Sequence, residues 1–337
     1  MEIQADTGEV KQAIAPFIIS ASRATDIPAF YGDWFMDRIR KGYVQWKSPF
    51  GGNPLYVSFE QARVLVFWSK DPAPFLYHLP ELNRLGYRYY FLVTLNDYEK
   101  ECLEPNVPLL EERIATFARL SGIVGKGRVV WRYDPLLLSD DITPGMLLDR
   151  IRRIGDRIHP YTGQMIFSFI EIARYPKVQR NLRKQGFGTV REFTGDEVAE
   201  FCTGLSRLNE SWGLDLRACA ERRDLSRYGI GRGQCINRDL MLREFGDDTA
   251  VREFLAGGEG QAVLSGEGQA VNTKRLKDPG QRASCQCIVS KDIGEYTTCP
   301  HLCAYCYANA SVATVRQKYV TYLKNTSEGK YGDTITG

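Results

Sequence analysis

Three cysteines lie within eight residues of the stretch TTCPHLCAYCYAN, which spans residues 297–309. They are Cys299, Cys303 and Cys306, and their spacing is C-x3-C-x2-C. Thiolates are soft ligands, so three of them on one short loop can bind a metal ion or an iron–sulfur cluster. Two of them could instead form a redox-active disulfide. The spacing therefore predicts metal or redox chemistry.

A zinc ion and an iron–sulfur cluster place different demands on such a loop. Structural zinc sites favour C-x2-C pairs that complete a set of four ligands. Here only three thiols are close together, and His301, the candidate fourth ligand, lies between two of them in a tight loop. A [4Fe–4S] cluster with three protein ligands fits better, because it leaves one iron open to a small molecule. A redox disulfide is the least favoured alternative.

The other cysteines are unevenly distributed along the chain. Cys102 and Cys202 stand alone, and we interpret them as ordinary structural residues. Four more precede the loop, in the second half of the chain: Cys219, Cys235, Cys285 and Cys287. Four thiolates are the number that a closed [4Fe–4S] cluster or a structural zinc ion requires. We expect a second cluster at these four residues; zinc, or a Cys219 that only packs within its strand, are the alternatives.

Regular elements precede the cysteine-rich region and must position it. Six apolar runs alternate with amphipathic segments, which indicates βαβ units and a parallel sheet. The expected strands are residues 17–22, 63–70, 88–95, 127–134, 164–172 and 214–221. The expected helices are residues 73–85, 109–121, 144–158, 176–185 and 195–211. This α/β pattern predicts a partial or full (β/α) TIM-like barrel with a C-terminal iron–sulfur segment.

Composition along the chain suggests three regions. Residues 1–250 should form the barrel, with a hairpin of residues 43–48 and 55–59. Residues 251–282 contain GEGQAV twice and few large apolar groups, which predicts a glycine-rich loop. Residues 283–337 should form the cysteine-rich segment, which binds the cluster and packs on the barrel.

Polar residues stand where several predicted strands end. In parallel α/β sheets, functional groups gather at the carboxyl ends of the strands. The candidate catalytic residues there are Arg23, Lys70, Arg132, Asp134 and Glu171. The three cations could bind a carboxylate or another anion, and the two carboxylates could orient them or transfer protons. For each residue alone, a solvated or capping charge is the alternative; Asp26 is expected to cap a helix.

The string CPHLCAYC resembles the signature of radical S-adenosylmethionine (SAM) enzymes, with Tyr305 in its aromatic position. The wider string, residues 299–308, is similar to the branch that contains spore photoproduct lyase. This resemblance implies a partial (β/α)6 barrel and a cluster on Cys299, Cys303 and Cys306 whose open iron binds SAM. It implies cleavage of SAM to a 5′-deoxyadenosyl radical, driven by a donor such as ferredoxin or flavodoxin. It also suggests a nucleotide or nucleic acid as substrate, although a small molecule would serve equally.

The order of the elements departs from that pattern. Radical SAM enzymes usually have the cysteine loop after their first strand, whereas here it follows all six. The string Gly257-Gly258-Glu259 matches a SAM-binding GGE motif, but it lies in the glycine repeat and we interpret it as coincidental. Nearly the whole chain also resembles an uncharacterised prokaryotic family of domain-of-unknown-function proteins. The matching stretches include ISASRATDIPAFY (19–31), VVWRYDPLLL (129–138) and CQCIVSKDIGEYTTCPHLCAYCYAN (285–309).

Composition limits the class of protein. The chain has 337 residues, 43% hydrophobic content and a formal net charge of +3, so it can bury a sizeable core and does not by itself require nucleic acid. We find neither a secretory signal nor an apolar run long enough for a membrane span. We therefore expect a cytoplasmic iron–sulfur enzyme of radical SAM type with no membrane partner. A non-SAM redox or electron-transfer protein, or a metal-stapled binding module, are the alternatives.

Overall fold

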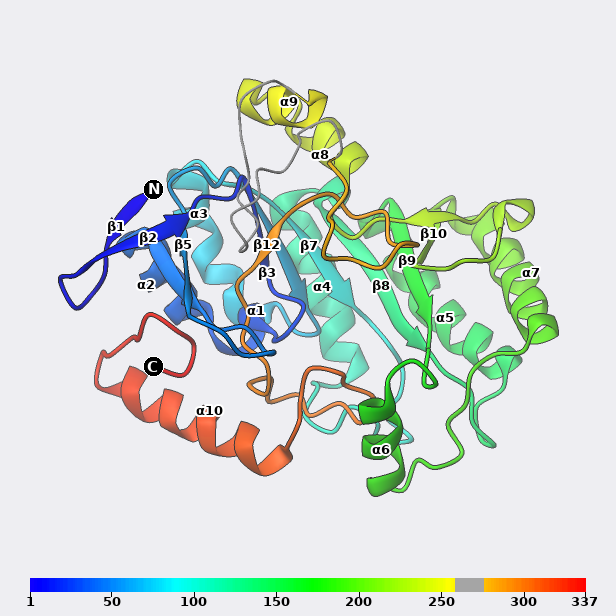
Figure 1. The fold of residues 1–337 in the computed structure, drawn as a ribbon. Helices are drawn as coiled ribbons and strands as arrows, with labels where there is room; N and C mark the ends of the chain where they lie inside the picture. Colours follow the sequence, from blue (N-terminus) through cyan, green and yellow to red (C-terminus); the bar gives the residue numbers. More distant parts are fainter. Residues whose placement is uncertain (258–275) are drawn as a thin grey trace.

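The computed structural model describes residues 1–257 and 276–337. Its centre is an open sheet of eight parallel strands, in the order β11-β10-β9-β8-β7-β6-β3-β12 (Figure 1). Six of them are the predicted strands, adjacent in chain order: β3 (Ile18–Ala21), β6 (Val64–Ser69), β7 (Arg88–Thr94), β8 (Val129–Leu136), β9 (Gln164–Phe169) and β10 (Asp215–Cys219). The short strands β11 (Gly231–Gly233) and β12 (Lys291–Asp292) form its edges.

The sheet does not close into a barrel within the described residues, so the expected full barrel is not formed there. After β10 the chain does not add the further βα units that closure would need. It instead forms two short helices, α8 (Arg238–Phe245) and α9 (Thr249–Ala256), which pack on one face of the sheet. None of the described helices combines the length and hydrophobicity that a bilayer span requires.

The other face of the sheet packs against the remaining helices of the repeating units. The predicted helices are confirmed as α3 (Leu79–Arg84) with the 3-10 turn Ala73–His78, α4 (Leu110–Val124), α5 (Pro144–Ile158), α6 (Pro176–Lys184) and α7 (Gly195–Trp212). The chain also forms α1 (Ile27–Phe30), α2 (Gly32–Lys41), α10 (Val312–Ser327) and the 3-10 turns Lys126–Arg128, His159–Tyr161 and Ser226–Tyr228.

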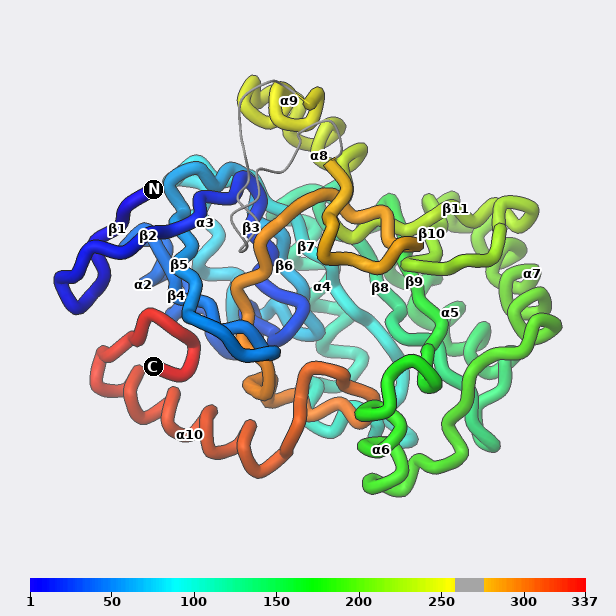
Figure 2. Tube along the Cα trace, viewed as in Figure 1, coloured from blue at the N-terminus to red at the C-terminus, as the bar shows by residue number. Residues whose placement is uncertain are grey.

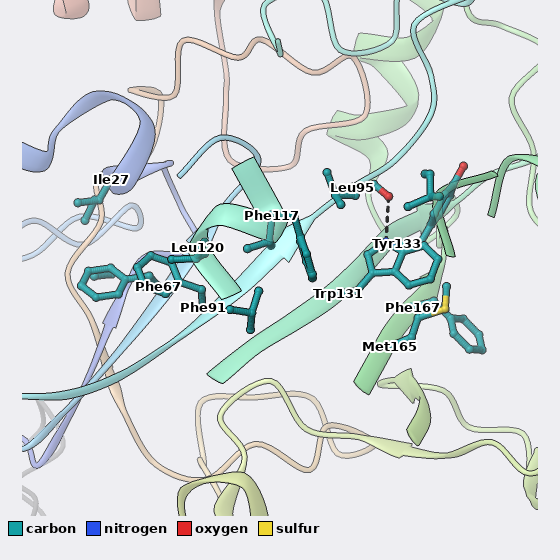
Figure 3. Close-up of a cluster of buried hydrophobic side chains, with 14 of the residues drawn as sticks. Ile27, Phe67, Phe91, Leu95, Phe117, Leu120, Trp131, Tyr133, Met165 and Phe167 are labelled. Atoms are coloured by element: carbon teal, nitrogen blue, oxygen red, sulfur yellow. Dashed lines mark hydrogen bonds between the residues drawn. The ribbon is translucent and has the colours of Figure 1, made fainter. Parts of the chain in front are cut away.

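Alternation along the strands divides the core into two layers, as expected when successive side chains point to opposite faces. Phe67, Phe91 and Trp131 pack with Phe117 of α4 in the larger layer (Figure 3). There the indole N–H of Trp131 donates a hydrogen bond to the Leu95 carbonyl, with 3.2 Å between the heavy atoms. The alternate strand residues belong to the second layer, which includes α8, α9 and three of the cysteines.

Three helices were not predicted from the sequence. Each begins at a polar cap, Asn237 for α8, Asp248 for α9 and Ser311 for α10, whose side chain accepts backbone hydrogen bonds from the first turn. Helix α9 occupies the start of the predicted glycine-rich loop, residues 251–282. Both GEGQAV copies and most of the GGE string lie outside the described residues.

A small four-stranded sheet joins the N-terminal residues to the first helices. Its order is β1 (Glu2–Gln4), β2 (Val10–Ile14), β5 (Leu55–Ser58), β4 (Tyr43–Trp46), and the predicted hairpin is confirmed as the antiparallel pair β4–β5. Asp6, between β1 and β2, accepts hydrogen bonds from Arg38 and Lys41 at 3.0 Å each and from the Tyr43 hydroxyl at 2.8 Å. Partial burial raises the pKa of Asp6, but these three donors outweigh it and lower the pKa to about 2.

The C-terminal segment joins the large sheet through β12, which pairs with β3 in parallel. The Asp292 carboxylate accepts hydrogen bonds from the hydroxyls of Ser22 at 2.7 Å and Ser20 at 3.0 Å. It also accepts them from the backbone N–H groups of Arg23 at 2.8 Å and Gly294 at 2.9 Å. A Cβ on Gly294 would lie 1.8 Å from the Ser22 hydroxyl oxygen, so the two segments are in close contact. One carboxylate thus anchors the tail to the first strand of the sheet.

We predict that Asp292→Asn destabilises the protein by about 2 kcal/mol, because the amide presents an N–H₂ group to donors that now meet a carboxylate oxygen. Urea unfolding followed by tryptophan fluorescence measures the change. Asp149→Asn is the matched control. The Asp149 side chain is 71% exposed and pairs with Arg152 on the surface, so this substitution should cost under about 0.5 kcal/mol. Equal effects of the two variants would contradict the anchoring role of Asp292.

We also predict a pH-dependent contribution from Asp6. Its pKa in the folded protein, about 2, lies below the ordinary value of 3.8, so the ionised form stabilises the fold above pH 4. This contribution should disappear as the pH falls from about 4 to about 2. Because the side chain is 34% exposed, solvent screening limits it to about 1 kcal/mol. The free energies of unfolding of the wild type and Asp6→Asn should converge over that range; a constant difference would refute the prediction.

Candidate functional site

The three-cysteine loop lies at the carboxyl ends of the parallel strands. Ala304, in the middle of the loop, donates its backbone N–H to the Leu103 carbonyl at 2.9 Å, beyond the end of β7. The Tyr305 hydroxyl lies 3.1 Å from the Lys70 ammonium, directly after β6, and 3.0 Å from the Asn96 amide nitrogen. Figures 1 and 2 show the orange tail passing along the sheet and then beside α6. The tail therefore returns to the ends of strands that precede it by more than two hundred residues.

His301 anchors the loop between its first two cysteines. Its Nε2 lies 2.9 Å from a carboxylate oxygen of Asp26, and its Nδ1 lies 3.2 Å from the Asn106 carbonyl oxygen. Asp26 also accepts the N–H of Ala29, which confirms that it caps helix α1, and the N–H of Lys70 at 2.7 Å. Because both ring nitrogens have protein partners, His301 positions the loop here instead of facing a metal as a fourth ligand.

A buried ion pair supports the aromatic residue of the loop. The Lys70 ammonium lies 2.6 Å from the Glu104 carboxylate, which also contacts the Tyr305 hydroxyl and accepts the Asn96 amide at 3.0 Å. Burial raises the pKa of Glu104, but the charges of Lys70 and Arg113 outweigh it and lower the pKa to about 2. The charge of Glu104 likewise outweighs burial and raises the pKa of Lys70. Sequence motifs did not reveal Glu104, because it lies in an irregular segment without periodicity.

The three cysteines of the loop are half-buried and reduced. Burial raises the pKa of Cys299 to about 12 and also raises the pKa values of Cys303 and Cys306. All nine cysteines are free of disulfides. Asn309 completes the loop: its side-chain amide donates to the Cys299 carbonyl at 2.9 Å, and its backbone N–H lies 3.4 Å from the Cys306 sulfur. Protonated thiols of this kind must lose their protons when they ligate a metal.

The other four cysteines converge at the end of β10, on the face that α8 and α9 cover. The sulfurs of Cys219 and Cys235 lie 3.8 Å apart. The Cys287 sulfur accepts the backbone N–H groups of Cys235 at 3.3 Å and Ile236 at 3.4 Å. Hydrogen bonds from the thiols of Cys235 and Cys285, followed by that of Ile236, lower the pKa of Cys287. The fold therefore brings together all four residues that the sequence grouped.

These thiols do not form a ready-made site for a single ion. Within residues 1–257 and 276–337, no three Cys, His, Asp or Glu side chains are already placed to hold one metal ion together.

Two of the predicted cations lie beside the four thiols. The guanidinium carbons of Arg23 and Arg132 lie 5.6 and 4.8 Å from the centre of the Trp68 ring. Arg132 forms an ion pair with Asp134, which also contacts the Ser168 hydroxyl. The Nε atoms of both arginines are buried and lack a hydrogen-bond partner among the described residues. Each guanidinium therefore retains donor capacity for a further acceptor.

The structure thus separates the predicted anion-binding residues into two groups. Arg23, Arg132 and Asp134 lie together, whereas Lys70 lies with Glu104 at the three-cysteine loop. Asn96 links the two groups: its side chain donates to the Asp134 carbonyl at 3.0 Å and accepts the Asp134 N–H at 2.9 Å.

Glu171 belongs to neither group. It forms an ion pair with Arg282, whose carbonyl accepts the N–H of Cys285 at 2.9 Å, so it lies toward the four thiols.

Comparison with known proteins identifies a family and nothing more specific. No curated protein and no solved structure matches the chain. A family model described as a domain of unknown function, DUF1848, matches residues 18–308. This range begins at β3 and ends within the three-cysteine segment, so it includes both thiol sets and all the strand-end residues described above. The chain belongs to the DUF1848 family.

Proposed function

We propose that the protein is an iron–sulfur enzyme of radical SAM type. The observation that supports this proposal is the position of the C-x3-C-x2-C loop at the carboxyl ends of parallel strands, although the loop follows all of those strands in the chain. Functional groups of parallel α/β sheets gather at these ends. A loop that served only to connect β12 with α10 would not require anchoring by His301 and Tyr305.

The residues of the loop fit a cluster with three protein ligands. Cys299, Cys303 and Cys306 would supply three thiolates from one short segment, and none of the three forms a disulfide. When bound, the cluster would pass one electron from a donor such as ferredoxin or flavodoxin to SAM, and cleavage of the sulfur–C5′ bond would yield methionine and a 5′-deoxyadenosyl radical. The protein's own residues would bind SAM and substrate, orient them and exclude water.

The strand-end residues take distinct parts in this proposal. Arg23 and Arg132 would bind the carboxylate of SAM or an anionic group of the substrate, because their buried Nε–H groups make no hydrogen bond among the described residues, the nearest carboxylate to the Nε of Arg23 being that of Asp292 at 3.9 Å. Asp134 would orient Arg132, and Glu171 would orient Arg282. Lys70 would act through Tyr305, because its ammonium is already paired with Glu104.

We propose a second cluster at Cys219, Cys235, Cys285 and Cys287. Backbone N–H groups directed at the Cys287 sulfur stabilise a thiolate there. The competing occupant is a single zinc ion. Two thiolates on a tetrahedron with 2.3 Å bonds stand about 3.8 Å apart, which is also the separation of the Cys219 and Cys235 sulfurs. Metal analysis distinguishes the two occupants.

A second candidate function is electron transfer without SAM. The presence of two thiol sets, one on either side of the Asn96 link, favours it, because two redox centres close together can exchange electrons. It predicts clusters that take up electrons without cleaving SAM.

The experiment is anaerobic reconstitution followed by addition of SAM and reductant. We expect about eight irons per chain if both sites hold [4Fe–4S] clusters, and formation of 5′-deoxyadenosine. Cys303→Ala should remove about four irons and abolish 5′-deoxyadenosine, while the circular dichroism of the fold is retained.

Cys102→Ala is the matched control, since Cys102 is exposed and belongs to neither set; it should retain full iron content and activity. Iron without SAM cleavage would favour electron transfer. Zinc without iron would refute both functions.

We predict that the Lys70–Glu104 ion pair positions Tyr305 and that its two buried charges stabilise each other. Glu104→Gln leaves a buried ammonium without a counter-charge and should destabilise the protein by about 3 kcal/mol in urea unfolding. The double variant Lys70→Met/Glu104→Gln removes both charges and should recover most of that loss. A double variant as unstable as the sum of its single variants would contradict the coupling.

A further inference from the structure

The segment from Arg174 to Lys184, which includes helix α6, contains a concentration of positive charge. It contains five cationic residues: Arg174, Lys177, Arg180, Arg183 and Lys184. No acidic residue occurs between Glu171 and Glu192. Those two carboxylates are engaged elsewhere, Glu171 with Arg282 and Glu192 with the backbone N–H of Ala173. None of the five cations forms a salt bridge within the described part of the chain, and four of them are exposed.

This cationic segment lies directly beside the three-cysteine loop (Figure 1). The Lys177 ammonium donates to the Tyr307 carbonyl at 3.2 Å, and the Asn181 amide to the Asn309 carbonyl at 3.5 Å. Val178 and Leu182 fix the orientation of the helix by burying its opposite side. The cations therefore border the site at which the proposed chemistry would occur.

Helix stability does not account for these charges. Arg183 and Lys184 in the last turn interact favourably with the helix dipole. Arg174 and Lys177 lie at the opposite end, where a cation is unfavourable, and the first turn contains no acidic residue. The N-cap residue Tyr175 also makes no side-chain capping hydrogen bond. Departures from the residue preferences that stabilise a helix are expected where a surface serves binding.

Aromatic rings lie between the cationic segment and the rest of the tail. Tyr307 is 43% exposed. Its ring centre lies 6.3 Å from that of Tyr175 and 6.3 Å from that of Tyr296. The Tyr307 hydroxyl donates to the Arg23 carbonyl at 3.0 Å, which fixes the ring against the strand-end residues.

We propose that this surface, the cationic segment together with Tyr175, Tyr296 and Tyr307, binds a single-stranded nucleic acid as the substrate of the proposed enzyme. Cations spaced along a helix match successive phosphates, and an exposed ring offers a face on which a base stacks. A duplex would keep its bases from such a ring. Membrane insertion would need exposed large apolar side chains, and those of α6 are buried. An acidic protein segment would pair with the cations but would not offer a series of flat bases to stack on the tyrosine rings, so it is included in the test as a competing ligand.

Fluorescence anisotropy with a labelled single-stranded 20-nucleotide probe tests this inference on the full-length protein, without SAM or reductant. We expect binding that weakens with salt, with a slope near −0.7 in log K against log salt for each phosphate contacted. The variant Arg174→Gln/Arg180→Gln/Arg183→Gln/Lys184→Gln should bind about tenfold or more weakly and reduce the slope by about 3. It omits Lys177, which contacts the loop backbone.

The matched control changes four exposed cations elsewhere: Arg119→Gln/Lys126→Gln/Arg207→Gln/Lys324→Gln. It alters the net charge equally and should leave binding within about twofold, because none of these residues lies on the proposed surface. Equal losses in both variants would overturn the inference, since total charge and not this surface would then determine affinity.

A second pair of variants isolates stacking from charge. Tyr307→Leu should weaken binding about fivefold to tenfold with an unchanged salt slope, and Tyr307→Phe should retain affinity. Equal binding of a polyglutamate peptide or of phosphatidylserine vesicles, or tighter binding of duplex, would overturn the inference.

The inference rests on the proposed function where it makes the nucleic acid a substrate, but the two fail separately. A protein that cleaves SAM and does not bind the single-stranded nucleic acid refutes only the inference. A protein that binds the nucleic acid and contains no iron refutes only the proposed function.

Discussion

The Asp292 carboxylate is the contact on which the arrangement of the candidate site most depends. It accepts four hydrogen bonds from residues at the end of β3 and from the tail itself, at 2.7 to 3.0 Å. These bonds fix the tail as an added parallel strand beside the first strand of the sheet. The segment that follows must then cross the carboxyl ends of the neighbouring strands, and the three cysteines lie on that segment. A carboxylate in this place can satisfy several donors at once, which no neutral side chain of the same size does equally well.

The same anchor links the two thiol sets. Arg23 donates its backbone N–H to Asp292, while its guanidinium group lies over Trp68 together with that of Arg132. On the other side of Arg132, Asn96 binds the backbone of Asp134 and contacts Tyr305 of the loop. A continuous series of packed and hydrogen-bonded groups therefore connects the four thiols at β10 with the three thiols of the loop. A charged centre at either set would lie within a shared, largely buried environment in which electrostatic interactions are strong.

Much of this fold could be predicted from the sequence, because the signals were local. The alternation of apolar strands and amphipathic helices identified six adjacent strands and five helices, and two of those helices, α5 and α7, begin at a threonine whose side chain caps the first turn. The C-x3-C-x2-C spacing identified the loop for the same reason, whereas the other four thiols were grouped by their number and meet only through tertiary contacts. Closure of the sheet was not predictable, since it depends on how the chain continues after β10 and not on any single repeat. Asp292 and Glu104 were missed because each lies in irregular structure and acquires its partners only through tertiary contacts.

The position of the cysteine loop after all six strands in the chain does not prevent it from reaching the carboxyl ends of those strands. In a parallel sheet all the carboxyl ends lie at one edge, so a ligand loop can reach that edge from either direction along the chain, provided something holds it there. A loop directly after the first strand is held by its own covalent connection. A loop that arrives last has no such constraint, and each of its fixed points must be supplied by side chains. The observed anchors have this character: Asp292 before the loop, His301 and Tyr305 within it, and Asn309 at its end. A loop that follows all the strands in the chain requires several such contacts if its thiols are to keep a defined geometry.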